Sequence, residues 1–168
     1  MANTSGQTPP AWKSGNLSYG IGLTLETAKR MLEAGEKEAG KQGIPMVIAV
    51  VDAGGNLLAF HRMDNALLLS IQVAMDKAFT AVFGKLHTSH WREVFQSGDF
   101  APLFLHERWM IFEGGLPIIS NGVLLGGIGV SGGTLEDLYV ARAALKAGGF
   151  SVDEVDAALA QIKAMKKE

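Results

Sequence analysis

A stretch of nineteen residues, from Ala66 to Gly84, carries only two charges, Asp76 and Lys77. Its other residues are mostly Leu, Ile, Val, Met, Phe and Ala. The length and composition are typical of a helix, and a helix that is apolar nearly all round packs on several sides. We expect Asp64 or Asn65 to cap this helix and Gly84 to end it. The stretch therefore predicts a central helix that other elements must cover.

Five short apolar runs are predicted to be strands, because turn residues separate them and β-branched residues are frequent in them. Asn121-Gly122 joins the last two runs. This dipeptide favours a tight type I′ hairpin, since both of its central residues need a positive φ. The predicted strands are Met46–Val51, Leu57–Met63, Trp109–Glu113, Leu116–Ser120 and Val123–Leu125.

Four more helices are predicted from cap residues and apolar spacing. Because the strands come as antiparallel hairpins and the helices are separate from them, the fold class is α+β rather than alternating βαβ. We expect an antiparallel sheet of about five strands flanked by helices. The four helices follow Thr24 up to Gly40–Gly43, cover Ser89–Gln96, run from Thr134 to Lys146, and occupy residues 151–166 behind a capping box of Ser151 and Glu154.

The chain is expected to form one domain, since 168 residues can bury a sufficient core and no linker or repeat divides them. Residues 1–22 are polar, lack an apolar period and are predicted to be a flexible tail. The single domain then covers residues 23–168. Hydrophobic residues make up 48% of the chain and charged ones only 19%. This balance favours a homo-oligomer, in which another copy covers apolar surface.

Charge and cysteine content exclude several classes of function. The net charge of −2 provides no basic surface for nucleic acid. Without cysteine there is no disulfide, no thiol nucleophile and no thiolate metal site. No signal-like apolar segment starts the chain, and the uncharged stretch 114–135 is too rich in glycine for a membrane span. A cytoplasmic protein is expected.

The glycines of Gly127-Ile-Gly129-Val-Ser-Gly132 match a dinucleotide-binding pattern. The chain lacks the following strand with an acidic residue, so a nicotinamide or flavin site is not predicted. Close packing of backbone explains the glycines equally well. A second interpretation is that the helix after Ser131 offers free N–H groups, between Ser131 and Leu135, to a carboxylate or phosphate.

Lys77 lies in the most apolar helix, on the same face as Ser70 and Thr80. A buried lysine is rare unless it is paired or functional. One interpretation is that Lys77 pairs with an acid or extends to the rim of the helix. The other is that it binds an anionic ligand or transfers a proton.

The segment His61-Arg62-Met63-Asp64 ends a strand, and alternation puts His61 and Met63 on one face and Arg62 on the other. Arg62 is placed to clamp a carboxylate. His61 is a candidate acid–base group or ligand, although a simple hydrogen bond also explains it. His87 and His90 are spaced to share a metal, but no third ligand accompanies them or His106, and no metal site is assigned. Haem needs only one axial ligand, so the composition permits it.

Several motifs, taken in order, resemble the GlcG/HbpS family, which includes the C-terminal domain of PduO-type corrinoid adenosyltransferases. They are Val50-Val-Asp-Ala-Gly-Gly-Asn56, Arg62-Met-Asp64, Ala74-Met-Asp-Lys-Ala78, Gly114-Gly-Leu-Pro-Ile118 and Gly126-Gly-Ile-Gly-Val-Ser-Gly-Gly133 with Asp137. The resemblance covers roughly residues 23–149. The predicted tail and the helix 151–166 are additions to the family pattern.

The resemblance implies a profilin-like layered sandwich, assembly into dimers or larger oligomers, and binding of haem or a related tetrapyrrole. It also implies a link to the catabolism of small acids or diols. No axial ligand transfers, because the first predicted helix contains no histidine. The ligand-binding positions that transfer, expected in a pocket near a subunit interface, are Arg62, Asp64, Lys77, Gly114, Gly115, Pro117, Gly129, Ser131 and Gly132.

Three functions remain open at this point. The first is a protein that binds a small anionic molecule, either haem or another planar anion, with Arg62 and Lys77 facing its carboxylates and one of the four histidines as axial ligand. The second is a cofactor-independent isomerase, lyase or decarboxylase of a small carboxylate, with Arg62 as clamp and Lys77 or His61 as acid–base group. The third is an oligomeric scaffold.

Overall fold

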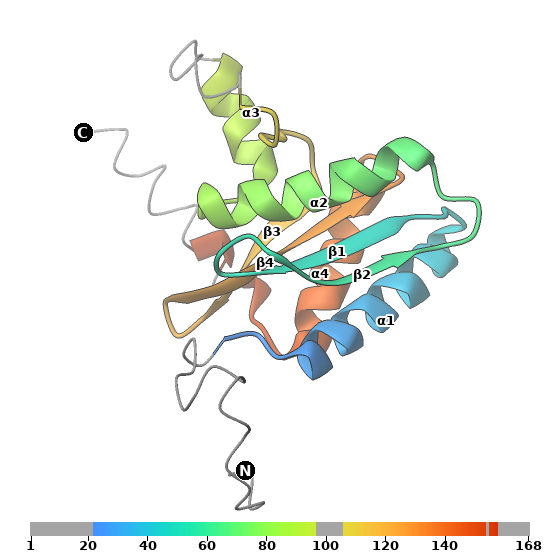
Figure 1. Cartoon of the computed structure of the whole chain (residues 1–168), viewed down its shortest axis with the longest axis horizontal. Helices are drawn as coiled ribbons and strands as arrows, with labels where there is room; N and C mark the ends of the chain where they lie inside the picture. The colour runs from blue at the N-terminus through green and yellow to red at the C-terminus, as the bar shows by residue number, and fades with distance from the viewer. Residues whose placement is uncertain (1–21, 97–105, 154, 158–168) are drawn as a thin grey trace, which may run out of the picture.

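A four-stranded antiparallel sheet lies between two layers of helices in the computed structural model, which describes residues 22–96, 106–153 and 155–157 (Figure 1). The strand order is β2-β1-β4-β3. The strands are β1 (Val47–Asp52), β2 (Leu57–Arg62), β3 (Gly115–Ser120) and β4 (Val123–Ser131), and the helices are α1 (Leu25–Gln42), α2 (Leu68–Phe83), α3 (Thr88–Gln96) and α4 (Leu135–Gly148).

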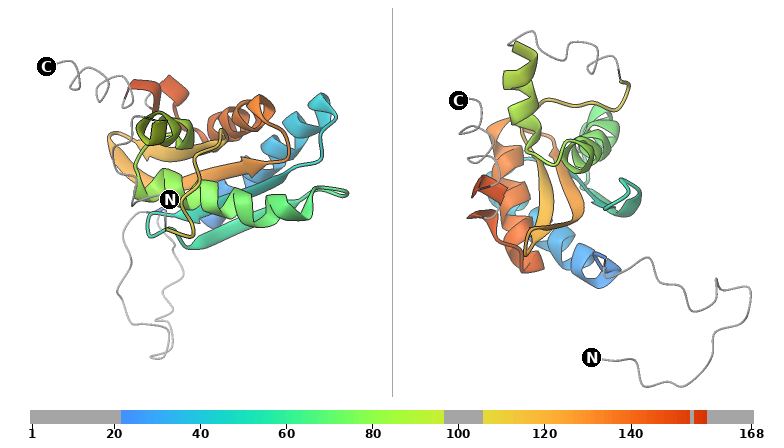
Figure 2. Two further views of the ribbon diagram at one scale, coloured as in Figure 1. Left: turned by 90° about the horizontal axis from the view of Figure 1, so that it is seen from above. Right: turned by 90° about the vertical axis from the view of Figure 1, so that its left-hand side faces the viewer.

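The two faces of the sheet are covered by different helices, as the views in Figure 2 show. Alternate strand residues point to opposite faces. Ile48 and Val130, for example, pack with α1 and α4 in the larger core cluster, whereas Val47 and Ala49 pack with Ala74 of α2. Helix α3 stands away from these layers, beside the C-terminal end of α2 (Figure 1).

Glycines of β4 let α2 lie directly on the sheet. A Cβ atom at Gly129 would be 2.0 Å from the carbonyl oxygen of Ala74, and one at Gly127 would be 2.5 Å from that of Ala78. Real Cβ atoms do not approach backbone so closely. Two glycines of the dinucleotide-like pattern are therefore required by helix packing, which is the structural interpretation of that pattern.

Several local predictions are confirmed. Thr24 caps α1 by accepting a hydrogen bond from the Thr27 N–H, and Gly43 ends the helix at φ +69°. Asn121 and Gly122 have φ values of +52° and +74° between directly paired strands, as a type I′ hairpin requires. The α+β class with an antiparallel sheet flanked by helices is also confirmed.

The predicted strand Trp109–Glu113 is wrong, and the described sheet has four strands instead of five. Side chains of neighbouring helices bind two of the backbone groups that a fifth strand would pair. Thr80 of α2 accepts a hydrogen bond from the Met110 N–H at 2.8 Å, and Thr88 of α3 donates to the carbonyl oxygen of Phe112. Because these backbone groups already have hydrogen-bond partners, the segment does not need to pair with a neighbouring strand.

Helix α2 also begins later than predicted, at Leu68. Neither Asp64 nor Asn65 caps it: the N-cap is Leu67, without a side-chain hydrogen bond. A turn from Met63 to Ala66, with Asn65 at φ +64°, precedes the helix instead. The predicted tail 1–22 lies outside the described residues except for Gly22, and the predicted helix 151–166 is helical at 152–153 and 155–157, its remainder lying outside them.

Candidate functional site

A pocket of about 410 Å³ opens where the N-terminal ends of α2 and α4 approach each other; we call it the α2–α4 pocket. Its floor consists of buried polar side chains, its walls are apolar, and a charged pair stands at its rim. The lining residues are Leu67, Leu69, Ser70, Val73, Lys77, Arg92, Phe112, Glu113, Ser131, Gly132, Gly133, Thr134, Leu135 and Asp137.

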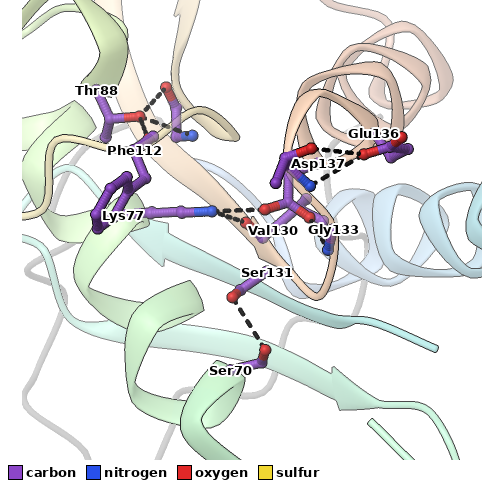
Figure 3. Close-up of polar contacts among 11 residues, drawn as sticks. Ser70, Lys77, Thr88, Phe112, Val130, Ser131, Gly133, Glu136 and Asp137 are labelled. Atoms are coloured by element: carbon purple, nitrogen blue, oxygen red, sulfur yellow. Dashed lines mark hydrogen bonds and ion pairs between the residues drawn. The ribbon is translucent and has the colours of Figure 1, made fainter. Parts of the chain in front are cut away.

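A buried ion pair occupies the floor of the pocket (Figure 3). Lys77 and Asp137 are each only 2% exposed. The Lys77 Nζ lies 2.7 Å from Asp137 Oδ2 and donates a second hydrogen bond, also 2.7 Å, to the carbonyl oxygen of Val130. Of the two interpretations of Lys77, pairing with an acid is therefore the one observed.

Gly114 leaves the space that this ion pair needs. Its φ is +102°, and a Cβ there would lie 2.6 Å from the Asp137 Cβ and 3.3 Å from the Lys77 Nζ. Burial lowers the pKa of Lys77, while Asp137 acts against that shift. Burial likewise raises the pKa of Asp137, opposed by Lys77. Removal from water thus disfavours both charged forms, and each charge depends on the other.

Two hydroxyl groups complete the buried floor. Ser131 Oγ donates to Ser70 Oγ at 3.0 Å, which joins the end of β4 to the first turn of α2 (Figure 3). Ser70 and Lys77, predicted to share a helix face, both line the pocket. Thr80, the third residue predicted on that face, bonds instead to the backbone of Arg108 and Met110.

The two helix N-termini at the pocket differ in how they are capped. At α4, Asp137 Oδ1 accepts from the Gly133 N–H at 2.8 Å, and Glu136 Oε2 accepts from the Thr134 N–H at 3.0 Å. These two N–H groups, predicted to be free for an anion, are already bonded. At α2, the first turn has no acidic residue and no side-chain cap. The positive end of the α2 dipole therefore has no counter-charge of its own there.

The rim carries the charge that reaches solvent. Arg92 of α3 lies with its Nη2 3.2 Å from Glu113 Oε1, and its side chain is 45% exposed. Sequence reasoning missed Arg92, because it lies in the weakly patterned segment between Lys85 and Arg108. Nothing in the spacing of that segment indicates which distant element its side chains face.

The structure does not bring the predicted cationic pair of Arg62 and Lys77 together in the α2–α4 pocket. Arg62 is exposed at the end of β2 and is not among the residues that line the α2–α4 pocket. His61 points to the opposite face of the sheet, as alternation predicted, with its Nδ1 3.0 Å from Glu36 Oε1 of α1. Asp64 is exposed in the turn before α2. One strand, β1, separates Arg62 from Ser131, and both residues pair with Val47 of that strand.

The other transferred positions fall into two groups. Ser131 and Gly132 line the pocket. Gly115, Pro117 and Gly129 do not: they are buried in the sheet, where Gly115 packs against Thr88 and Gly129 against α2. Pro117 lies on β3, an edge strand, where its missing N–H is tolerated.

None of the histidines proposed as an axial ligand lines the α2–α4 pocket. His87, just before α3, and His90, within α3, are buried, and His106 stacks on Phe79. Burial lowers the pKa of His87, although Asp156, 3.5 Å from its Nε2, opposes that shift. Within the described ranges, no three His, Asp or Glu side chains are close enough to hold a metal ion. No described helix combines the length and apolar character of a membrane span.

Comparison with known proteins gives a consistent result. Residues 23–146 match the family described as haem degrading protein HbpS-like. A 15.0 kDa protein of Citrobacter freundii, encoded between dhaT and dhaS, is 41% identical over 127 residues, which cover 73% of this chain and 89% of that protein.

Two solved structures extend the similarity to the fold. The complex of PduOC with haem has a TM-score of 0.71 at 32% identity, covering 76% of this chain and 95% of that one. A double mutant of HbpS from Streptomyces reticuli has a TM-score of 0.72 at 33% identity, covering 83% of this chain and 96% of that one. The predicted resemblance is confirmed.

Proposed function

This chain belongs to the HbpS-like family of haem degrading proteins, and on that premise we propose that it binds an amphiphilic anion of the haem type in the α2–α4 pocket. One observation carries the proposal. Large apolar side chains that are more than half exposed, among them Leu67, Leu69 and Phe112, surround a floor of buried polar groups. Such apolar surface, hollowed and rimmed by charge, is typical of a ligand site.

The charges at the pocket favour a negative ligand. The side chain of Arg92 is partly exposed and can turn from Glu113 to a carboxylate, with which an arginine makes two parallel hydrogen bonds. The uncapped first turn of α2 adds the positive end of a sixteen-residue helix. Lys77 is not needed for this role, because Asp137 and Val130 already accept its hydrogen bonds.

The lining suits some parts of haem and not others. The apolar walls match a macrocycle, and Arg92 matches a propionate. The described lining contains no histidine, methionine or tyrosine, so it supplies no usual axial ligand for iron. The solved complex of PduOC with haem gives further support to haem as the ligand. The proposal therefore rests on contacts to the ring and its carboxylates.

We also propose that a second copy of the chain borders this pocket. Leu67, Leu68 and Leu69 are 61%, 74% and 74% exposed, and only two of them line the pocket. Three consecutive exposed leucines are costly for a monomer in water. A homo-oligomer would bury Leu68 while Leu67 and Leu69 contact the ligand.

The test is a titration of haem, followed by its absorption band, into the wild type and two matched variants. Arg92→Gln is expected to weaken binding about tenfold, the effect of losing one charge-assisted hydrogen bond. Arg62→Gln removes the same charge from an exposed site outside the lining and should leave the affinity unchanged. Equal affinities for all three proteins, or a larger loss in Arg62→Gln, would overturn the proposal.

A second candidate function, proton transfer on a small carboxylate, is favoured by the Lys77–Asp137 pair on the floor of the pocket. Burial shifts the pKa values of both groups toward neutrality, as in many acid–base sites. Its test is exchange of α-protons for deuterium in a panel of small carboxylates, compared between the wild type and the double variant Lys77→Met/Asp137→Leu. Equal exchange rates in the two proteins would exclude this function.

A further inference from the structure

A second cavity of about 410 Å³ lies between the C-terminal end of α2 and α3, and it shares no lining residue with the α2–α4 pocket. We call it the aromatic cavity, because most of its lining is aromatic. The rings of Phe79 and Phe83 are stacked with centroids 4.1 Å apart, and those of Trp91 and Trp109 meet edge to face at 5.0 Å. The lining residues are Phe79, Phe83, Gly84, Lys85, Trp91, His106 and Trp109.

The polar side-chain groups of this lining are hydrogen-bond donors. The indole Nε1 atoms of Trp91 and Trp109 are buried and have no acceptor among the described residues. His106 Nδ1 accepts from the Arg108 N–H at 3.2 Å, so the neutral imidazole carries its proton on Nε2. Buried donors without an acceptor are rare in proteins. The cavity therefore has hydrogen-bond donors that a ligand rich in acceptors could satisfy.

The lining of the aromatic cavity carries a positive charge. Lys85 is an exposed lining residue, and its φ of +56° is one that a lysine rarely adopts. Strained residues of this kind are frequent at functional sites. The Arg108 guanidinium, 3.9 Å above the Phe79 ring, is paired with Asp76, whose Oδ1 lies 3.1 Å from its Nε. The described lining itself has no acidic residue. A cationic ligand of the kind that aromatic cages hold would meet like charge here.

We propose that the aromatic cavity binds a planar aromatic carboxylate, with its ring against the Phe and Trp side chains and its carboxylate toward Lys85. A flat ring satisfies the stacking surfaces. A carboxylate supplies the acceptors that the indole and imidazole donors lack. This site is separate from the proposed haem-type site, and either can fail without the other.

The experiment uses the indole N–H signals of isotope-labelled protein in proton–nitrogen correlation spectra. The chain has three tryptophans, Trp12, Trp91 and Trp109, and Trp91→Phe and Trp109→Phe assign the signals. Titration with naphthoate is expected to shift the Trp91 and Trp109 signals in a saturable way. Naphthylmethylammonium, a flat cation, and cyclohexanecarboxylate, an anion without an aromatic ring, should leave them in place.

Two variants locate the ligand. Lys85→Asn removes the charge, and asparagine tolerates a positive φ, so the fold is preserved while naphthoate affinity falls about tenfold. Arg92→Gln, a change at the other pocket, should bind naphthoate within about twofold of the wild type. The proposal is overturned if naphthoate moves neither signal, if the cation binds equally well, if Lys85→Asn binds like the wild type, or if Arg92→Gln abolishes the shifts.

Discussion

Lys77 is the residue whose setting most limits what the site can do. Its Nζ donates hydrogen bonds to Asp137 and to the carbonyl oxygen of Val130. With Asp137 it forms a buried ion pair beneath the apolar walls of the α2–α4 pocket. A buried charge that loses its partner remains out of water with nothing to stabilise it. This dependence can be measured directly in stability.

Lys77→Met is expected to lower the free energy of unfolding by about 3–5 kcal/mol, because it leaves Asp137 buried and unpaired. The double variant Lys77→Met/Asp137→Leu should recover much of that loss. Urea unfolding measures both. Lys41→Met is the control, since Lys41 pairs with Glu38 at the surface and its loss should cost less than about 1 kcal/mol. A double variant no more stable than Lys77→Met would contradict the account of the pair.

His87 gives the expected dependence of stability on pH. In the folded chain, burial lowers the pKa of His87 below the ordinary value near 6.5, which applies to the unfolded chain. At a pH between the folded and the unfolded pKa, the unfolded chain therefore binds more protons than the folded one. The free energy of unfolding should therefore fall as the pH drops below about 6.5. Urea midpoints at several pH values measure this slope. The slope should become shallower in His87→Phe; an unchanged slope in that variant would assign it to other groups.

At the scale of elements, the contact between α2 and β4 determines where the site lies. Gly127 and Gly129 allow the helix backbone to approach the strand, and this approach brings Ser70 within 3.0 Å of Ser131. The glycine pattern thus serves the site indirectly, by positioning the helix that carries Lys77.

Two matched Gly→Ala changes test this role with effects of opposite sign. Gly129→Ala should destabilise the fold by about 3 kcal/mol or more, since its Cβ would overlap the Ala74 carbonyl oxygen. Gly40→Ala, in α1 with open space around it, should stabilise the fold by up to about 1 kcal/mol. Thermal unfolding of both variants checks that one change lowers the stability and the other raises it. A neutral Gly129→Ala would show that α2 can move off the sheet at little cost.

Features that neighbouring residues decide were predicted correctly from the sequence, whereas features that depend on residues far away in the sequence were not. The Thr24 cap and the Asn121-Gly122 hairpin are decided by neighbouring residues, and spacing alone identified them. The segment Trp109–Glu113 failed because Thr80 and Thr88, far away in sequence, bind its backbone. Arg92 was missed for the same reason. Periodicity places a residue on a face, but it does not say which element covers that face.

At the scale of the whole molecule, the exposed leucines before and at the start of α2 bear on assembly. Leu68→Glu is expected to shift the proposed oligomer toward monomers, because it places a charge in the buried contact. Val123→Glu is the control, an apolar position on the β3–β4 hairpin that is 58% exposed. Sedimentation measures both. A monomeric wild type, or the same loss in Val123→Glu, would contradict the assembly.

Hydrogen–deuterium exchange of the full chain with and without haem tests the central claim most directly, because it locates the ligand without assuming which residue matters. The account predicts slower exchange in residues 67–70 and 131–135, the two backbone segments that border the α2–α4 pocket, with residues 57–62 of β2 unchanged. Slower exchange confined to β2 or to α1, with both pocket segments unaffected, would contradict it.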